Sequence, residues 1–181
     1  MARYVALLRG INVGGKNVIS MASLKACFEE IGFDDVATYI QSGNVLFETT
    51  GAARTLAAKI EKALEATYKV PLVVVVRSHQ QLAKIVSSAP KGFGTQAAKY
   101  RYDVAFLKEP VAARSLVKDI PLKEGVDDLA AGTGVLYMRR LTSRATSSRL
   151  NRVASIPAYK SMTIRNWNTT TKLLALLDAR R

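Results

Sequence analysis

The spacing of apolar residues in the first half of the chain alternates between the strand period and the helix period. It predicts a strand at 3–9, a helix at 20–31, strands at 36–41 and 44–49, a helix at 53–68 and a strand at 71–77. Ser20 has a side chain suited to cap the first helix, and Ser42 with Gly43 suits a two-residue turn between the paired strands. The order βαββαβ is that of the ferredoxin-like motif, in which a four-stranded antiparallel sheet carries two helices on one face.

The same order of elements returns, in weaker form, in the second half. A connecting helix near 80–86 and a loop at 90–94 precede a strand at 100–107, a helix at 112–118, strands at 126–129 and 134–140, a helix at 148–155, an extended segment at 162–165 and a helix at 172–179. No repeat of residue identities accompanies this order, so the duplication rests on the elements alone. We therefore predict an α+β protein with two ferredoxin-like subdomains, at 1–90 and 91–181, each with an antiparallel sheet.

Composition places the chain among ordinary globular proteins. Of its 181 residues, 49% are hydrophobic and 23% charged, which excludes disordered and collagen-like classes. The longest apolar run, 71–76, is far shorter than the roughly 20 residues that span a membrane. Since the N-terminus also lacks the apolar core of a secretory leader and Cys27 has no partner for a disulfide, we expect a cytoplasmic protein with no membrane association.

Charge is the most informative part of the composition. The chain has 27 Lys and Arg against 14 Asp and Glu, a net charge of +13. The excess is concentrated at 139–181, which holds ten basic residues and a single acid, Asp178. Such a surface attracts polyanions such as nucleic acid, although solvated basic surfaces without a ligand are also common.

A glycine-rich loop follows the first strand. Gly10 to Lys16 fits the spacing G-x-x-x-x-G-K of a phosphate-binding P-loop, but Asn17 replaces the Ser or Thr that ligates magnesium. The helix is also expected to begin only at about Ser20. The sequence therefore disfavours a nucleotide-hydrolysing P-loop, and it leaves open a loop that binds some anion through Lys16 and its backbone, or a purely structural loop.

A second polar segment, 165–172, joins the last extended segment to the last helix. Asn168 or Thr169 is expected to cap that helix, and Arg165 and Lys172 flank the same point. A helix N-terminus with two bases favours an anion. The alternative is that the Asn and Thr residues are ordinary caps and Trp167 is a core residue.

Familiar catalytic arrangements are missing from the sequence. His79 is the single histidine, Ser42 does not lie in a G-x-S-x-G elbow, and Cys27 lies on the apolar face of a predicted helix. We therefore predict no metal, no cofactor and no identifiable catalytic residue. Single-strand binders use aromatic stacking platforms, for which the candidates are Tyr4, Tyr39, Phe47, Tyr100, Tyr102 and Tyr137. Half of these are expected in the core, and neither subdomain contains an RNP-type segment.

Three separate motifs carry a family resemblance: Leu8–Lys16, Thr38–Phe47 and Arg165–Leu173. In this order they resemble the bacterial family catalogued as domain of unknown function 1697, and Ser148–Asn151 resembles a further, weaker block of it. The resemblance covers almost the whole chain and implies a cytoplasmic bacterial protein of two ferredoxin-like subdomains, with no assigned activity. The signature positions that it transfers to this chain are Arg9, Gly10, Asn12, Gly14, Gly15, Lys16, Gln41, Ser42, Gly43, Asn44, Arg165, Asn166, Trp167, Asn168 and Lys172.

These polar, glycine-rich loops have the composition of a binding site. The predicted ligand-binding residues are Arg9, Asn12, Gly14, Gly15, Lys16, Gln41, Ser42, Asn44, Arg165, Asn166, Asn168 and Lys172. The four bases among them are expected to supply charge, and Asn12, Gln41, Asn44 and Asn168 directed hydrogen bonds.

The expected anion is a phosphate group, and its source stays open. The preferred source of the phosphate is a nucleic acid. The alternative is a nucleotide or phosphorylated metabolite on which an enzyme acts. A third alternative is an interaction module without a ligand. The sequence leaves the oligomeric state undecided.

Overall fold

The computed structural model describes residues 1–180, and Arg181, the last base of the C-terminal run, lies outside them. The chain forms two compact units, which are described separately. Unit 1 comprises Met1–Ala83 and Leu173–Arg181, and unit 2 comprises Lys84–Lys172.

The C-terminal residues pack with the N-terminal strand of unit 1. The Arg3 guanidinium donates to the carbonyl oxygens of Leu177 at 2.7 Å and Arg180 at 2.6 Å. His79 Nε2 lies 2.6 Å from Asp178 Oδ1. These contacts explain why the end of the chain belongs to unit 1, whereas element order alone assigns it to the second subdomain.

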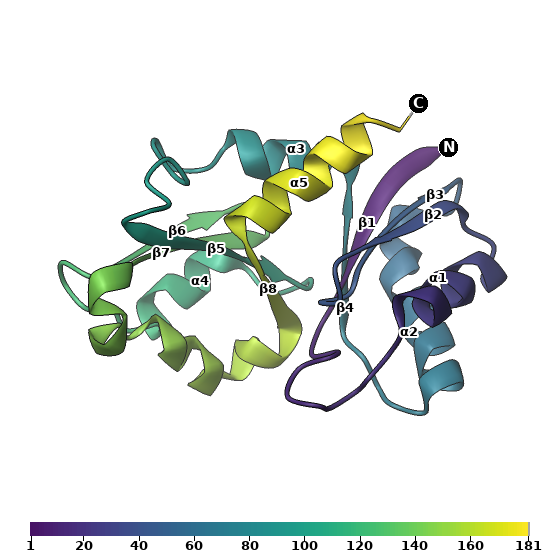
Figure 1. Cartoon of the computed structure of the whole chain (residues 1–181), viewed down its shortest axis with the longest axis horizontal. Coiled ribbons are helices and arrows are strands. Elements are labelled where there is room, and N and C mark those ends of the chain that lie inside the picture. The colour runs from purple at the N-terminus through teal and green to yellow at the C-terminus, as the bar shows by residue number, and fades with distance from the viewer. Residues whose placement is uncertain (181) are drawn as a thin grey trace. The chain divides into compact units, whose positions relative to one another are not determined.

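Unit 1 is a ferredoxin-like fold, as predicted. Its elements are β1 (Ala2–Leu8), α1 (Met21–Glu30), β2 (Asp34–Tyr39), β3 (Asn44–Thr49), α2 (Ala53–Tyr68) and β4 (Val74–Ser78). The sheet order is β2-β3-β1-β4 with antiparallel neighbours, and α1 and α2 cover one face (Figure 1). The helix α3 (His79–Ser87) then leads into unit 2.

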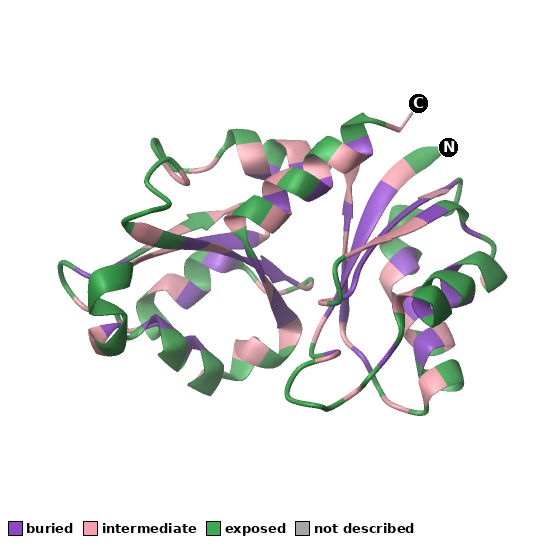
Figure 2. Cartoon of the chain, in the orientation of Figure 1, coloured by how far each residue is buried: buried purple, intermediate pink, exposed green. Residues whose placement is uncertain are grey.

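The core of unit 1 lies between the sheet and these two helices, where buried positions gather on the facing sides of both (Figure 2). Ser20 caps α1 as expected, because its side chain accepts a hydrogen bond from Ser23 N. The rings of Phe33 and Phe47 stack at 4.4 Å between centroids. Cys27 is 3% exposed within this core, which confirms its interpretation as a small buried apolar residue.

The turn between β2 and β3 differs from its prediction. Tyr39 pairs with Asn44, so four residues connect the strands and the predicted two-residue turn is wrong. Gly43 adopts the expected positive φ of 83°, but Ile40 also turns left-handed at 48°. The buried Asn44 amide closes this wider loop by donating to Tyr39 O at 2.9 Å and Ser42 Oγ at 3.0 Å.

Unit 2 repeats the same topology. Its strands are β5 (Tyr100–Leu107), β6 (Asp127–Gly132), β7 (Val135–Leu141) and β8 (Met162–Asn166), in the antiparallel order β6-β7-β5-β8. The short helix α4 (Ala113–Leu116) and the 3₁₀ turn η1 (Val117–Asp119) follow β5, and α5 (Trp167–Asp178) follows β8. Two four-stranded antiparallel sheets in this order confirm the predicted fold class.

The second helix of the motif is degenerate in unit 2. Three 3₁₀ segments take its place: η2 (Thr142–Ser147), η3 (Leu150–Ser155) and η4 (Pro157–Ser161). The helix predicted at 148–155 is therefore wrong in type, because the segment is held by contacts that its own sequence does not show. Leu150 and Val153 still pack on one face of the sheet, beside Met138 and Met162.

The last helix begins five residues earlier than predicted. α5 starts at Trp167, directly after β8, and Asn166 Oδ1 accepts a hydrogen bond from Asn168 N at 2.7 Å. Asn166 is thus the cap, and the predicted caps Asn168 and Thr169 lie inside the helix. Among helices of residues 1–180, none combines the length and apolar character needed to cross a bilayer.

Candidate functional site

The glycine-rich loop of unit 1 folds back on itself as a miniature hairpin. Val13 and Lys16 form an antiparallel bridge, with Lys16 N donating to Val13 O at 3.0 Å. Gly14 and Gly15 between them have φ of 59° and 72°, the left-handed pair that a type I′ turn requires. Lys16 is exposed at this tip. The loop therefore holds Lys16 outward, and its amides do not open a helix as those of a P-loop do.

Asn12 joins this loop to the β2–β3 turn. Its Nδ2 donates to the carbonyl oxygens of Ile19 and Gln41, both at 2.9 Å, and its Oδ1 accepts from Ile19 N at 2.8 Å. Its backbone is left-handed, with φ of 53°. The amide predicted to bind a ligand thus bonds to the backbone of two neighbouring segments.

The turn itself packs tightly against the loop. Gly43 O accepts from Leu8 N at 2.8 Å, and a Cβ at Gly43 would lie 2.7 Å from the Ile11 side chain. The structure therefore brings the predicted residues of 9–16 and 41–44 together in unit 1. Lys16 and Gln41 are exposed, Arg9, Asn12 and Ser42 are half-buried, and Asn44 is buried.

The remaining predicted residues lie together in unit 2. Arg165 is 7% exposed, and its Nη1 donates to Thr163 Oγ1 at 2.7 Å and Ile164 O at 3.0 Å. Burial lowers the pKa of Arg165 to about 10. Asn166, Asn168 and Lys172 are exposed at the end of β8 and along the start of α5, so they are the accessible members of this group.

Unit 2 also holds an aromatic cluster centred on Phe93. The Phe93 ring contacts three others edge-on: Tyr102 at 4.9 Å, Trp167 at 5.0 Å and Tyr137 at 5.5 Å between centroids. The absence of a side chain at Gly94 makes room for the Trp167 ring, since a Cβ there would lie 2.2 Å from Trp167 Nε1. The buried Tyr137 hydroxyl donates to Ile85 O at 2.5 Å, and burial raises the pKa of Tyr137. The middle of this sheet face is therefore covered by α3 and the Phe93 loop.

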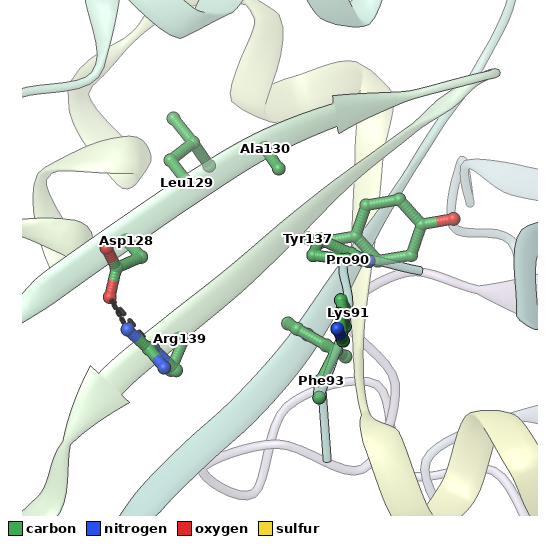
Figure 3. Close-up of a pocket in the computed structure, with 9 residues that line it drawn as sticks. Pro90, Lys91, Phe93, Asp128, Leu129, Ala130, Tyr137 and Arg139 are labelled. Atoms are coloured by element: carbon green, nitrogen blue, oxygen red, sulfur yellow. Dashed lines mark hydrogen bonds and ion pairs between the residues drawn. The ribbon is translucent and has the colours of Figure 1, made fainter. Parts of the chain in front are cut away.

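Two hollows are lined by rings of this aromatic cluster. The larger, of about 300 Å³, is drawn in Figure 3 and is lined by Pro90, Lys91, Gly92, Phe93, Asp128, Leu129, Ala130, Tyr137 and Arg139. The smaller, of about 190 Å³, is lined by Gly94, Ala97, Tyr100, Arg101, Tyr102, Thr142, Asn166, Trp167 and Asn168. Both open beside aromatic rings and basic side chains.

Arg139 is held in place at the open end of the sheet. Its Nε and Nη2 lie 2.8 and 2.5 Å from Asp128 Oδ2 (Figure 3), and this hydrogen bond raises the pKa of Arg139. Its guanidinium lies 4.4 Å from the centroid of the Tyr100 ring, over which Lys99 Nζ also lies, at 5.1 Å. We call Phe93, Lys99, Tyr100, Arg139 and Trp167 the aromatic–basic patch.

Sequence reasoning identified only part of this patch. Tyr100 was a candidate platform and Arg139 belonged to the basic run, whereas Phe93 was missed. The available signal was its position between Gly92 and Gly94, whose φ values of 77° and 84° turn the loop around the ring. Two other candidate platforms, Tyr4 and Phe47, are core residues of unit 1.

Among residues 1–180, no three His, Cys, Asp or Glu side chains lie close enough together to hold a metal ion.

Comparison with known proteins identifies a family and a solved structure that the chain resembles. The model of the family described as "Protein of unknown function (DUF1697)" matches residues 1–137. Among solved structures, the chain is similar to the conserved bacterial protein SP0830 from Streptococcus pneumoniae, with 26% identity, a TM-score of 0.84 and coverage of 97% of this chain and 98% of that one. No curated protein matched.

Proposed function

The chain belongs to this family of proteins of unknown function, and we propose that it binds single-stranded nucleic acid through the aromatic–basic patch of unit 2. The observation that carries the proposal is the arrangement of Arg139 and Lys99 over the Tyr100 ring, beside two hollows lined by aromatic residues. Every base has a π-face, so such surfaces bind bases by stacking with little sequence preference.

The charge of unit 2 supports the same function. Residues 84–172 contain 16 basic and 6 acidic side chains, so unit 2 carries +10 of the chain's +13. Basic side chains that neutralise phosphates release condensed counterions, which makes affinity depend steeply on salt. The concentration of charge in the unit that holds the patch favours a polyanion over a small ligand.

Coverage of the sheet restricts the way in which nucleic acid binds. Tyr102 and Tyr137 are buried beneath the Phe93 ring, so bases do not stack on these two tyrosines. Bases can reach the rings of the sheet itself at its end, where Tyr100 and Arg139 lie. A duplex keeps its base faces stacked inside, so this patch favours single strands.

The loop residues predicted from the sequence belong to the same proposal. In unit 2 the exposed members of that set are Asn166, Asn168 and Lys172, and we assign them to the phosphate backbone. Phosphate contacts of this kind position a strand without reading its sequence. A cytoplasmic location, as expected from the sequence, is part of the same proposal.

Fluorescence anisotropy of a labelled oligothymidylate of about 12 nucleotides tests the proposal. Tyr100→Leu and Arg139→Gln are each expected to raise the Kd about tenfold, since stacking contributes roughly 1–3 kcal/mol per base. Arg114→Gln on α4, an exposed base of the same unit, is the matched control and is expected to change the Kd less than about twofold. Trp167, the single tryptophan, gives a second readout through quenching of its fluorescence.

The salt dependence separates the alternatives. Binding with a steep negative slope of log K against log salt, weakened by both patch variants, supports the proposal. Equal loss in the control and the patch variants means that charge alone attracts the strand, and the patch assignment is then wrong. Saturable binding of a mononucleotide, without affinity for the oligonucleotide, would favour the enzyme alternative.

A further inference from the structure

The face of the unit 2 sheet opposite the aromatic–basic patch carries a further cavity, of about 290 Å³. It lies where a full second helix of the motif would cover the sheet, and where the 3₁₀ segments η3 and η4 stand instead. Short 3₁₀ segments have three residues per turn and cover a sheet less completely than a long helix does. The lining residues are Arg101, Asp103, Met138, Arg140, Leu150, Asn151, Val153, Ala154, Tyr159 and Ile164.

The wall formed by η3 is fixed by Asp127. Its carboxylate accepts hydrogen bonds from Ser148 Oγ at 2.6 Å, Arg149 N at 2.7 Å and Lys123 N at 2.9 Å. These bonds hold the start of η3 against β6, so Leu150 and Asn151 stand at defined positions in the lining. The cavity is therefore pre-formed, which reduces the ordering that a ligand must impose.

Two charged residues that line the cavity, Asp103 and Arg140, are neighbours on the sheet. Asp103 pairs with Met138 across β5 and β7, and Arg140, two residues further on, pairs with Arg101. Side chains alternate along a strand, so Asp103 and Arg140 share one face as diagonal neighbours. The Asp103 side chain is 16% exposed, and its Oδ2 accepts from Arg101 Nε at 2.8 Å.

One atom of each group lacks a hydrogen-bond partner. Asp103 Oδ1, an acceptor, and Arg140 Nε, a donor, are both buried without one among residues 1–180. Buried polar atoms in folded proteins are nearly always bonded, and an exception calls for an explanation such as a bound polar molecule. The complementary molecule has to donate to the carboxylate and accept from the guanidinium.

We propose that this cavity binds a free α-amino acid with an apolar side chain. The ammonium group lies on the Asp103 carboxylate and the carboxylate on the Arg140 guanidinium, which are charge-assisted pairs. The side chain lies on the apolar lining of Met138, Leu150 and Ile164. A simple acid would leave Asp103 Oδ1 without a donor, and a simple amine would leave Arg140 Nε without an acceptor, so the site requires both groups in one molecule.

The test uses the whole protein, labelled with ¹⁵N, and three probes that differ by one group. L-Leucine is expected to cause saturable amide shifts confined to the residues that line the cavity, on β5 and β7 as well as on η3 and η4. 3-Methylbutylamine, which lacks the carboxylate, and 4-methylpentanoate, which lacks the ammonium group, are expected to bind at least about tenfold more weakly, because each forms one charge-assisted pair instead of two.

Matched variants give the second half of the test. Asp103→Asn and Arg140→Met are expected to weaken L-leucine binding at least about tenfold. Asp119→Asn and Arg114→Gln, which remove the same charges at exposed positions of unit 2, are the controls and are expected to leave it unchanged. Absence of saturation by about 10 mM, or equal binding of the three probes, overturns the proposal. The probe series decides the question even if an Asp103 or Arg140 variant fails to fold.

Discussion

Asn12 gives the most quantitative prediction for the fold of unit 1. Its side chain makes three hydrogen bonds, two to carbonyl oxygens at 2.9 Å and one from an amide at 2.8 Å. Asn12→Ala removes all three and leaves an alanine at a φ of 53°. Each bond contributes about 0.5–1.5 kcal/mol net. A left-handed non-glycine residue without a compensating side chain adds about 1–2 kcal/mol.

The sum for Asn12→Ala is a loss of about 3 kcal/mol in the free energy of unfolding, because half-burial lets water replace part of each bond. For a chain of this length, that loss lowers the Tm by about 6–12 °C. Guanidinium unfolding followed by far-UV circular dichroism measures the change as a shift of the midpoint.

Asn17→Ala is the matched control for this prediction. Asn17 has the same left-handed backbone, with φ of 49°, but its side chain makes one hydrogen bond, to Gly10 O at 3.0 Å. The loss is therefore expected to be smaller by about 2 kcal/mol, the contribution of two bonds. Equal midpoints for the two variants would refute the assignment of stability to the Asn12 amide, and the difference between Asn12→Ala and Asn12→Gly then reports the backbone contribution.

Two further predictions concern unit 2. Burial acts to raise the pKa of Asp127, but its hydrogen bonds from Ser148 and two backbone amides outweigh this, and the pKa is lowered below its ordinary value. Its contribution to stability is thus present above the unfolded pKa of about 3.9 and is lost as pH falls through the folded pKa, so Asp127→Asn should flatten the acid limb of a Tm-against-pH curve. Gly94→Ala should destabilise unit 2 and shift the emission of Trp167, because the new Cβ would lie 2.2 Å from the indole. Gly92→Ala is its control, because φ is also positive there, at 77°, but the nearest atom to the added Cβ is 3.7 Å away. Equal effects of the two substitutions would contradict the role of the Trp167 contact.

The element order of the chain was readable from local patterns, and it was sufficient for the fold class. Helix spacing in α1 and α2, with Ser20 as cap, reflects burial of one helix face, and alternation in β3 reflects the pleat of the sheet. These signals depend on residues close in sequence. The antiparallel order of both sheets then follows from the βαββαβ motif.

Elements determined by distant contacts were predicted poorly. The segment 148–155 has an apolar spacing typical of a helix, but Asp127, more than 20 positions earlier, bonds to Ser148 and Arg149, and Ser148 has an extended backbone just before the 3₁₀ segment η3. The wide turn before β3 depends in the same way on Asn44, whose side chain bonds back to Tyr39. Local propensity does not contain either contact.

The candidate site shows the same division. Sequence reasoning selects polar loop residues, but an asparagine that binds a ligand and one that bonds to its own backbone have the same one-letter code. Asn12, Asn44 and Asn166 use their side chains inside the protein. The aromatic–basic patch joins Phe93 to Trp167 across more than 70 positions, so its members come together only when the fold is known.

Arg139 and Arg140 provide a crossed test of the two sites of unit 2. They are adjacent in β7, and alternation of side chains along a strand directs them to opposite faces of the sheet. Arg139 lies over Tyr100 in the patch, and Arg140 lines the cavity beneath η3. Arg139→Gln should therefore weaken oligonucleotide binding alone, and Arg140→Gln should weaken L-leucine binding alone. If either substitution abolishes both, the losses reflect distortion of β7, and the two surfaces are not independent binding sites.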